Sequence, residues 1–130
     1  LWNGVTKVSL DELLRSSDVV SIHTPLNENT HHLINSENLK LLKQSSVIIN
    51  AARGGVVDDK ALAKILRGNK IKGAALDVFE TEPMDQSSGD YFKGLDNVIL
   101  TPHIGGVTYE ANQQVSSMIA KKVDEHLSNL

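Results

Sequence analysis

Arg53, Glu82 and His103 stand in three separate loops of the sequence, each after a short apolar run and each beside glycine or proline. An arginine presents a flat, permanently charged fork that suits a carboxylate. A histidine titrates near neutral pH and can donate or accept a proton, and a nearby carboxylate can hold its ring. Because the loops that follow the strands of an open parallel sheet converge on one crevice, we expect the three side chains to meet. Such a group can bind an anionic substrate and move a proton, as redox chemistry at a carbinol carbon requires.

Each of the three residues also has an ordinary structural interpretation. Arg53 could be a surface arginine on a turn, because charged side chains mostly lie outside. Glu82 could be a solvated charge like Glu80 and Asp85, and His103 could be a half-buried histidine without a chemical role. The three loops taken together therefore favour chemistry more than any one residue does.

Asp77 ends another apolar run, where its carboxylate could accept from an amide or hydroxyl of a bound ring or simply cap a strand. His31 and His32 have no partner at metal-ligand spacing. We therefore predict no metal site and expect both histidines at the surface.

The apolar runs that must position these loops lie at 19–22, 47–49, 74–78 and 98–100. They do not alternate apolar with polar residues, so we expect both faces of the strands to be covered, as in a parallel sheet between helices. Strand and helix signals take turns along the chain, which is typical of βαβ units. The prediction is an α/β fold.

Helix starts are indicated by capping residues. Ser9 and Glu12 have the spacing of a capping box, and two further helices are expected behind Ser36 and Asp58 as N-caps. Their apolar stripes are Leu39 and Leu42 in one, and Ala61, Leu62, Ile65 and Leu66 in the other.

A long helix is predicted from Thr108 to about Leu127, because apolar residues recur there on one stripe. The stripe comprises Ala111, Val115, Met118, Ile119, Val123 and Leu127. The segment 80–97 shows no such periodicity, and connections of that length in compact domains are usually functional or disordered.

Composition narrows the class of protein. The 130 residues are 40% apolar, enough for one domain with a real core. A formal net charge of −3 provides no basic field for nucleic acid or anionic lipid, so neither is expected as a partner. There is no cysteine, and no apolar run approaches 18 residues. We expect a soluble, cytoplasmic protein.

Four segments of the chain carry a family resemblance. They are residues 21–35 with the motif Ser-Ile-His-Thr-Pro-Leu, residues 50–62 with Asn-Ala-Ala-Arg-Gly-Gly, residues 73–83, which end in Glu-Thr-Glu-Pro, and residues 97–106 with Thr-Pro-His-Ile-Gly-Gly. In this collinear order they resemble the C-terminal part of the nucleotide-binding domain of D-isomer-specific 2-hydroxyacid dehydrogenases. That NAD-dependent family includes D-3-phosphoglycerate dehydrogenase. The resemblance implies a Rossmann-like parallel sheet with flanking helices.

The resemblance also assigns roles to residues. His103 would take the hydroxyl proton as hydride leaves C2 of the substrate for nicotinamide, and Glu82 would hold the imidazole and stabilise its protonated form. Arg53 would grip the substrate carboxylate. The family's NAD contacts would map to Thr24, Ala51, Arg53, Asp77, His103, Gly105 and Gly106.

Several parts of the family pattern are missing from this sequence. The glycine-rich G-x-G-x-x-G turn, the acidic residue that reads the ribose, and the separate substrate domain are all absent. We therefore expect residues 1–130 to be part of an NAD-binding domain within a longer protein, inactive alone and a homo-oligomer, such as a dimer, when intact. The residue that discriminates NAD from NADP is not present.

The implied activity interconverts a D-2-hydroxy acid and a 2-oxo acid. Phosphoglycerate, and with it serine biosynthesis, is the first candidate on overall resemblance, and reduction of glyoxylate or hydroxypyruvate remains open. A different class of function is an NAD-sensing transcriptional corepressor, because such relatives share the fold and much of the loop set. A third interpretation, an inert structural segment, requires the matched loops to be a coincidence.

Overall fold

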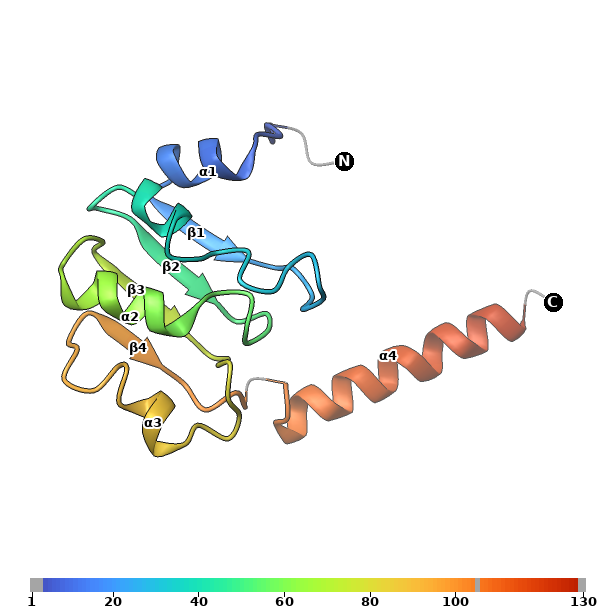
Figure 1. Ribbon diagram of the computed structural model, residues 1–130. Coiled ribbons are helices and arrows are strands. Elements are labelled where there is room, and N and C mark those ends of the chain that lie inside the picture. The colour runs from blue at the N-terminus through green and yellow to red at the C-terminus, as the bar shows by residue number, and fades with distance from the viewer. Residues whose placement is uncertain (1–3, 105, 129–130) are drawn as a thin grey trace.

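The computed structural model describes residues 4–104 and 106–128, and within them four parallel strands form one sheet (Figure 1). The strands are β1 (Val19–Ile22), β2 (Val47–Asn50), β3 (Gly73–Leu76) and β4 (Val98–Leu100), and they lie side by side in chain order. The register pairs Ile22 with Asn50, Asn50 with Leu76, and Leu76 with Leu100. All four strands therefore end at one edge of the sheet. The predicted α/β fold is confirmed.

Helices lie before, between and after the strands. They are α1 (Leu10–Ser16), the 3-10 helix η1 (Asn38–Leu41), α2 (Asp59–Arg67), α3 (Gln86–Gly89) and α4 (Tyr109–Leu127). Ser9 caps α1 by accepting from the Glu12 NH, and Asp58 caps α2 by accepting from the Ala61 NH. Both N-caps are confirmed where the spacing of the sequence predicted them.

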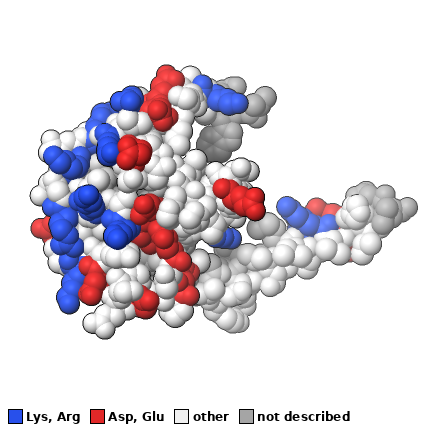
Figure 2. Space-filling view, viewed as in Figure 1, with Lys and Arg blue, Asp and Glu red and all other residues white. Residues whose placement is uncertain are grey.

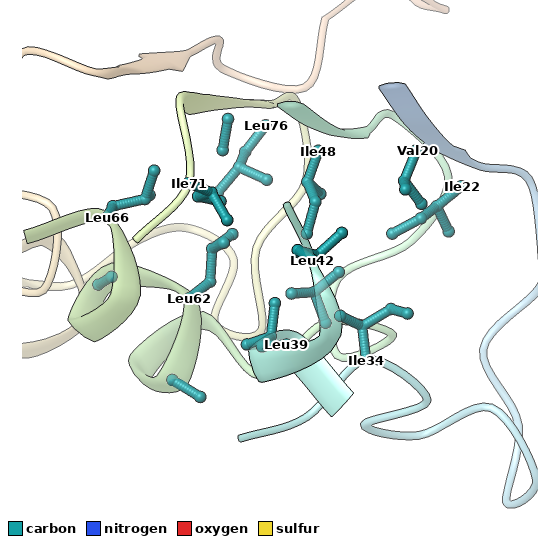
Figure 3. Close-up of a cluster of buried hydrophobic side chains, with 14 of the residues drawn as sticks. Val20, Ile22, Ile34, Leu39, Leu42, Ile48, Leu62, Leu66, Ile71 and Leu76 are labelled. Carbon is teal, nitrogen blue, oxygen red and sulfur yellow. The ribbon is translucent and has the colours of Figure 1, made fainter. Parts of the chain in front are cut away.

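One hydrophobic core joins α1, η1 and α2 to a single face of the sheet (Figure 3). Leu39 of η1 and Leu62 and Leu66 of α2 are each 1% exposed or less, and they face strand residues such as Ile48 and Leu76. Sequential parallel strands joined by right-handed crossovers place every connection on the same side. This topology explains why η1 and α2, which lie in the connections from β1 to β2 and from β2 to β3, cover the same face.

The expectation that both faces of the strands are covered is wrong for this chain. Val19 is 58% exposed and Ile99 is 67% exposed, and both point to the face opposite the helices. The apolar runs identified buried strands but could not show that, within residues 4–104 and 106–128, helices cover only one face of the sheet. The uncovered face remains available to other protein.

Two local predictions also need correction. Ser36 does not cap an α-helix, because η1 starts after Glu37 and the Asn35 side chain accepts from the NH groups of Glu37 and Asn38. The segment 80–97 contains the single-turn helix α3, capped by Asp85. Four residues are too few to show a helical period in a sequence.

Helix α4 is confirmed and begins behind the N-cap Thr108. It extends away from the sheet (Figure 1), and its apolar stripe, including Val115 and Met118, is about half exposed. Within residues 4–104 and 106–128, no helix combines the length and the hydropathy needed to cross a bilayer.

Candidate active site

His103 and Glu82 lie in direct contact where strands β3 and β4 end. The Nδ1 atom of His103 is 2.7 Å from Glu82 Oε2, and the two side chains are 45% and 35% exposed. The predicted contact between them is confirmed. Because Nδ1 faces the carboxylate, the other ring nitrogen, Nε2, is the one available to a bound molecule.

The turn after β3 places the carboxylate. Glu82 Oε1 accepts from the Phe79 NH at 2.8 Å, so one oxygen is held by the main chain while the other contacts His103. The Phe79 NH thus fixes the Glu82 side chain within its own turn. The peptide bond between Glu82 and Pro83 is cis.

Asp77 places the histidine. Its Oδ1 accepts from the His103 NH at 3.2 Å and also from the Thr101 hydroxyl, which ties the loop after β4 to the end of β3. His103 has a positive φ of 53°, an uncommon backbone conformation for a non-glycine residue. Such backbone angles persist where the surroundings hold them, and they are frequent at functional sites.

The charge of Glu82 is stabilised by this arrangement. Partial burial pushes the pKa of the carboxyl upward, but the hydrogen bonds from His103 and from the Phe79 NH outweigh it, and the pKa lies below its ordinary value. An ionised Glu82 places a negative charge against the Nδ1 side of the His103 ring. The pair is therefore suited to accept a proton and hold it.

A cleft of about 620 Å³ opens beside the pair. Phe79, Met84, Leu100 and Pro102 give it apolar walls, and His103 reaches it as a polar group. An apolar cleft with a few convergent polar groups is the usual form of a small-molecule site.

Arg53 lines a second cavity, of about 330 Å³, at the same edge of the sheet. It follows β2, whereas His103 follows β4, so the structure does not place the arginine in the cleft that His103 and Glu82 share. Its guanidinium donates to the Ala52 carbonyl at 2.6 Å, and among the described residues it forms no ion pair. The cation remains available to an anionic group.

The loop that carries Arg53 is held by two features. Asn50, 1% exposed at the end of β2, accepts from the Ala52 NH and donates to the Arg53 carbonyl. A Cβ atom on Gly54 would lie 1.7 Å from the carbonyl oxygen of Phe79. Only glycine allows this approach, which brings the loops after β2 and β3 together.

The second cavity has a vacant hydrogen-bonding group. The Thr24 hydroxyl oxygen is buried and has no partner among the described residues, and Thr24 lines the cavity with Ala51 and Arg53. Buried polar groups are nearly always hydrogen-bonded, so the Thr24 hydroxyl is free to bond to a polar group in this cavity. These three residues fit the polar part of a nucleotide cofactor.

The other predicted cofactor residues lie at the same edge or nearby. Asp77 stands between the two cavities in strand order and uses Oδ1 to hold the next loop. Gly106 is exposed, with no atom within 4 Å of the position of a Cβ. Gly105 lies outside the described residues.

Figure 2 shows that Lys and Arg side chains gather on the left of the view. This is the side where the strands begin in Figure 1. On this face the positive surface thus lies apart from the edge where the strands end. A bound carboxylate at that edge would rely on Arg53 rather than on a general basic surface.

Two contacts near these loops were not predicted from the sequence. His32 was expected at the surface, yet its Nε2 lies 3.1 Å from Glu80 Oε1, and Glu80 in turn bonds to Asp59. The charged residues are visible in the sequence, but no spacing rule connects positions 32, 59 and 80. The role of Asn50 had one available signal, a polar residue ending an apolar run.

The chain belongs to the family of D-isomer specific 2-hydroxyacid dehydrogenases. Residues 2–105 match the model of its NAD binding domain, and the four-stranded parallel sheet is the Rossmann-like fold of that domain.

Individual relatives support the assignment. (S)-Sulfolactate dehydrogenase of Chromohalobacter salexigens is 47% identical over 116 residues, which cover 88% of this chain and 37% of the relative. A D-lactate dehydrogenase of Aquifex aeolicus, solved with NAD and lactic acid, has a TM-score of 0.75 at 37% identity over 94% of this chain and 40% of its own. A glyoxylate reductase of Paecilomyes thermophila has a TM-score of 0.77 at 37% identity over 90% of this chain and 35% of its own. This chain spans 40% or less of each.

Proposed function

We propose that the intact protein is an NAD-dependent dehydrogenase that interconverts a D-2-hydroxy acid and its 2-oxo acid. The observation that carries the proposal is the 2.7 Å contact between His103 Nδ1 and Glu82 Oε2 in an apolar cleft where two strands end. It supplies a proton acceptor with a fixed orientation, as alcohol oxidation requires.

In the proposed reaction His103 moves the proton. During oxidation its Nε2 takes the proton of the substrate hydroxyl, and during reduction it returns a proton to the substrate oxygen. Glu82 orients the ring and stabilises the imidazolium, while Arg53 binds the substrate carboxylate through its guanidinium fork. NAD, when bound, accepts the hydride from C2 or donates it back.

We propose Thr24, Ala51 and Arg53 as cofactor contacts in the second cavity, with Asp77 and His103 toward the reacting ring. Support comes from the unpartnered Thr24 hydroxyl and from the position of Asp77 between the loops of Arg53 and His103. The glycines at 105 and 106 complete the set by family resemblance. The remainder of the NAD site belongs to protein outside these 130 residues, in an assembly that we propose is a homo-oligomer.

The particular substrate is a finer proposal. Phosphoglycerate remains the candidate favoured by the sequence, but the relatives described above act by their names on sulfolactate, lactate and glyoxylate. Each of these four compounds is one member of a pair of a 2-hydroxy acid and a 2-oxo acid. In every pair the reacting carbon is bonded directly to a carboxylate. That shared group is the part that Arg53 and His103 would recognise.

The test is reduction by the full-length protein, with NADH oxidation followed at 340 nm. The panel comprises four 2-oxo acids: phosphohydroxypyruvate, sulfopyruvate, pyruvate and glyoxylate. We expect turnover with at least one, and a loss of about 10²- to 10⁴-fold in His103→Ala, the usual contribution of general acid–base catalysis.

NADH binding without turnover on any of these acids would contradict the proposal. That result would favour the corepressor-like alternative, because such a protein needs the cofactor contacts but not the proton transfer. Equal turnover in wild type and His103→Ala would remove His103 from its role.

A further inference from the structure

Asp59, the first residue of α2, is 4% exposed although it carries a carboxyl group. Its NH donates to Glu80 Oε1 at 2.8 Å, and its Oδ2 accepts from the Glu80 NH at 3.0 Å. Each carboxylate thus satisfies the main chain of the other residue. The two bonds tie the start of α2 to the turn after β3, 21 positions along the chain.

Burial raises the pKa of the Asp59 carboxyl to about 6, while its hydrogen bond with Glu80 acts in the opposite direction. A buried carboxylate destabilises the fold unless it is hydrogen-bonded or paired with an opposite charge. An apolar residue would pack the same volume without that cost, so the packing of the core does not explain an aspartate here.

His32 contacts the same pair from the loop after β1. Its Nε2 is 3.1 Å from Glu80 Oε1, its ring stacks on His31 with centroids 4.0 Å apart, and its NH donates to the Gly55 carbonyl. The loops after β1 and β2 and the turn after β3 therefore meet at Glu80.

The turn that Glu80 belongs to is the one that presents Glu82. The NH of Phe79, directly before Glu80, donates to Glu82 Oε1 and leaves Oε2 for His103. A shift of the main chain at Glu80 would move this NH and with it the carboxylate that holds the imidazole.

We propose that Asp59 and Glu80 are positioning residues that keep Glu82 in contact with His103 for proton transfer. The inference rests on the proposed function, in which His103 moves the proton. Neither residue lines the cleft of His103. They act by holding the turn after β3 in place through the two hydrogen bonds between them.

The test compares four variants of the full-length protein: Glu80→Ala, Asp59→Ala, Asp59→Asn and Asp58→Ala. Two quantities are measured, the pH at which the His103 imidazole titrates by NMR, assigned with His103→Gln, and the acidic limb of the pH profile for oxidation. Asp77 and Glu82 are the titratable residues bonded to His103, and all four variants keep both.

We expect Glu80→Ala and Asp59→Ala to move the His103 titration and the acidic limb together toward lower pH, because imidazolium loses the carboxylate. Turnover in the reduction should fall by up to about 10²-fold, as a displaced catalytic group can cost. Asp59→Asn retains an oxygen that accepts from the Glu80 NH and should keep the wild-type titration.

Asp58→Ala is the matched control, since it removes the N-cap of α2 beside Asp59 but has no bond to the turn. It should lower stability, as the loss of a cap does, and leave the His103 titration in place. Should Asp59→Ala fail to fold, Glu80→Ala decides the question, because the Glu80 side chain is 34% exposed.

A Glu80→Ala protein that is less stable but titrates at His103 as the wild type does would overturn the inference, leaving the pair a structural role only. The NMR titration needs no turnover. If no 2-oxo acid is reduced, the proposed function fails while the positioning of Glu82 by Glu80 is still measured.

Discussion

At the scale of single residues, the charge of Glu82 is the feature that the proposed chemistry depends on most directly. One oxygen is held by the Phe79 NH, so the other meets His103 with its orientation already set. The lowered pKa of Glu82 favours the ionised carboxylate beside the ring. The acid–base behaviour of the site therefore belongs to the pair and not to the imidazole alone.

Glu82→Gln in the full-length protein should separate charge from hydrogen bonding. The amide oxygen can still accept from His103, but the imidazolium loses its counter-charge. Oxidation, which needs neutral histidine, should extend to lower pH, and reduction, which needs the protonated ring, should lose activity first near neutral pH. Rate profiles between pH 5 and 10 measure both limbs, and an unshifted acidic limb would uncouple Glu82 from His103.

Asp59 should make stability depend on pH in a recognisable way. Its pKa is about 6 in the folded protein against an ordinary 3.8, so the folded state binds the proton more tightly than the unfolded state. The stabilisation of the folded state by protonation of Asp59 is complete below about pH 4 and is lost as pH rises through 6. Two pKa units correspond to about 3 kcal/mol, an order-of-magnitude figure.

Asp59→Asn should abolish this dependence. In urea unfolding of the full-length protein, the variant should gain stability relative to wild type as pH rises from 4 to 7, by up to about 3 kcal/mol. Parallel stability curves for the two proteins across that range would show that Asp59 is ionised in the folded state as readily as in the unfolded chain.

At the scale of elements, the loops after the strands are coupled by direct contact. Gly54 lets the loop of Arg53 approach the main chain of Phe79, the same residue whose NH holds Glu82. The two cavities that receive the candidate cofactor and substrate groups are thus connected through one glycine contact.

Gly54→Ala should be strongly destabilising, because its Cβ would lie 1.7 Å from the Phe79 carbonyl oxygen and one loop must move. We expect a loss of about 1–3 kcal/mol or more, the range for overpacked sites. Gly68→Ala is a suitable control, since its Cβ would meet atoms at 3.5 Å and should change stability by no more than about 0.5 kcal/mol. Comparable losses in both variants by urea denaturation would contradict the proposed contact.

At the scale of the whole molecule, two apolar surfaces lack cover within the described residues. One is the sheet face with Val19 and Ile99, and the other is the stripe of α4 with Met118 and Ile119. Contiguous exposed apolar surface usually marks an interface with other protein. The lengths of the relatives, of which this chain spans 40% or less, fit that interpretation.

The 130-residue chain alone should therefore associate or show low solubility. Light scattering across a wide concentration range measures this, and a monodisperse monomer throughout would count against the prediction. Ile119→Lys should reduce the association because it places a charge in the stripe. Ser117→Lys adds the same charge outside the stripe and should leave association as it is.

Local signals in the sequence were enough to predict the strands, two of the helix starts and the family of this protein. Apolar runs located the four strands, Ser9 and Asp58 located two helix starts, and the four motif segments identified the family. These features depend on neighbouring residues, through backbone hydrogen bonding and periodic burial, so a linear reading reaches them.

Other features were decided by the tertiary structure alone. The separate cavity of Arg53, the buried pairing of Asp59 with Glu80 and the open face of the sheet each depend on which loops and layers meet. Residues 21 positions apart come together because strand order and crossover hand bring two strand ends side by side, and side-chain spacing along the sequence carries no record of that. The contact of Glu82 with His103 stands between the two cases: its residues were recognisable from their motifs, but only the fold of the 77–83 turn aims one carboxylate oxygen at the ring.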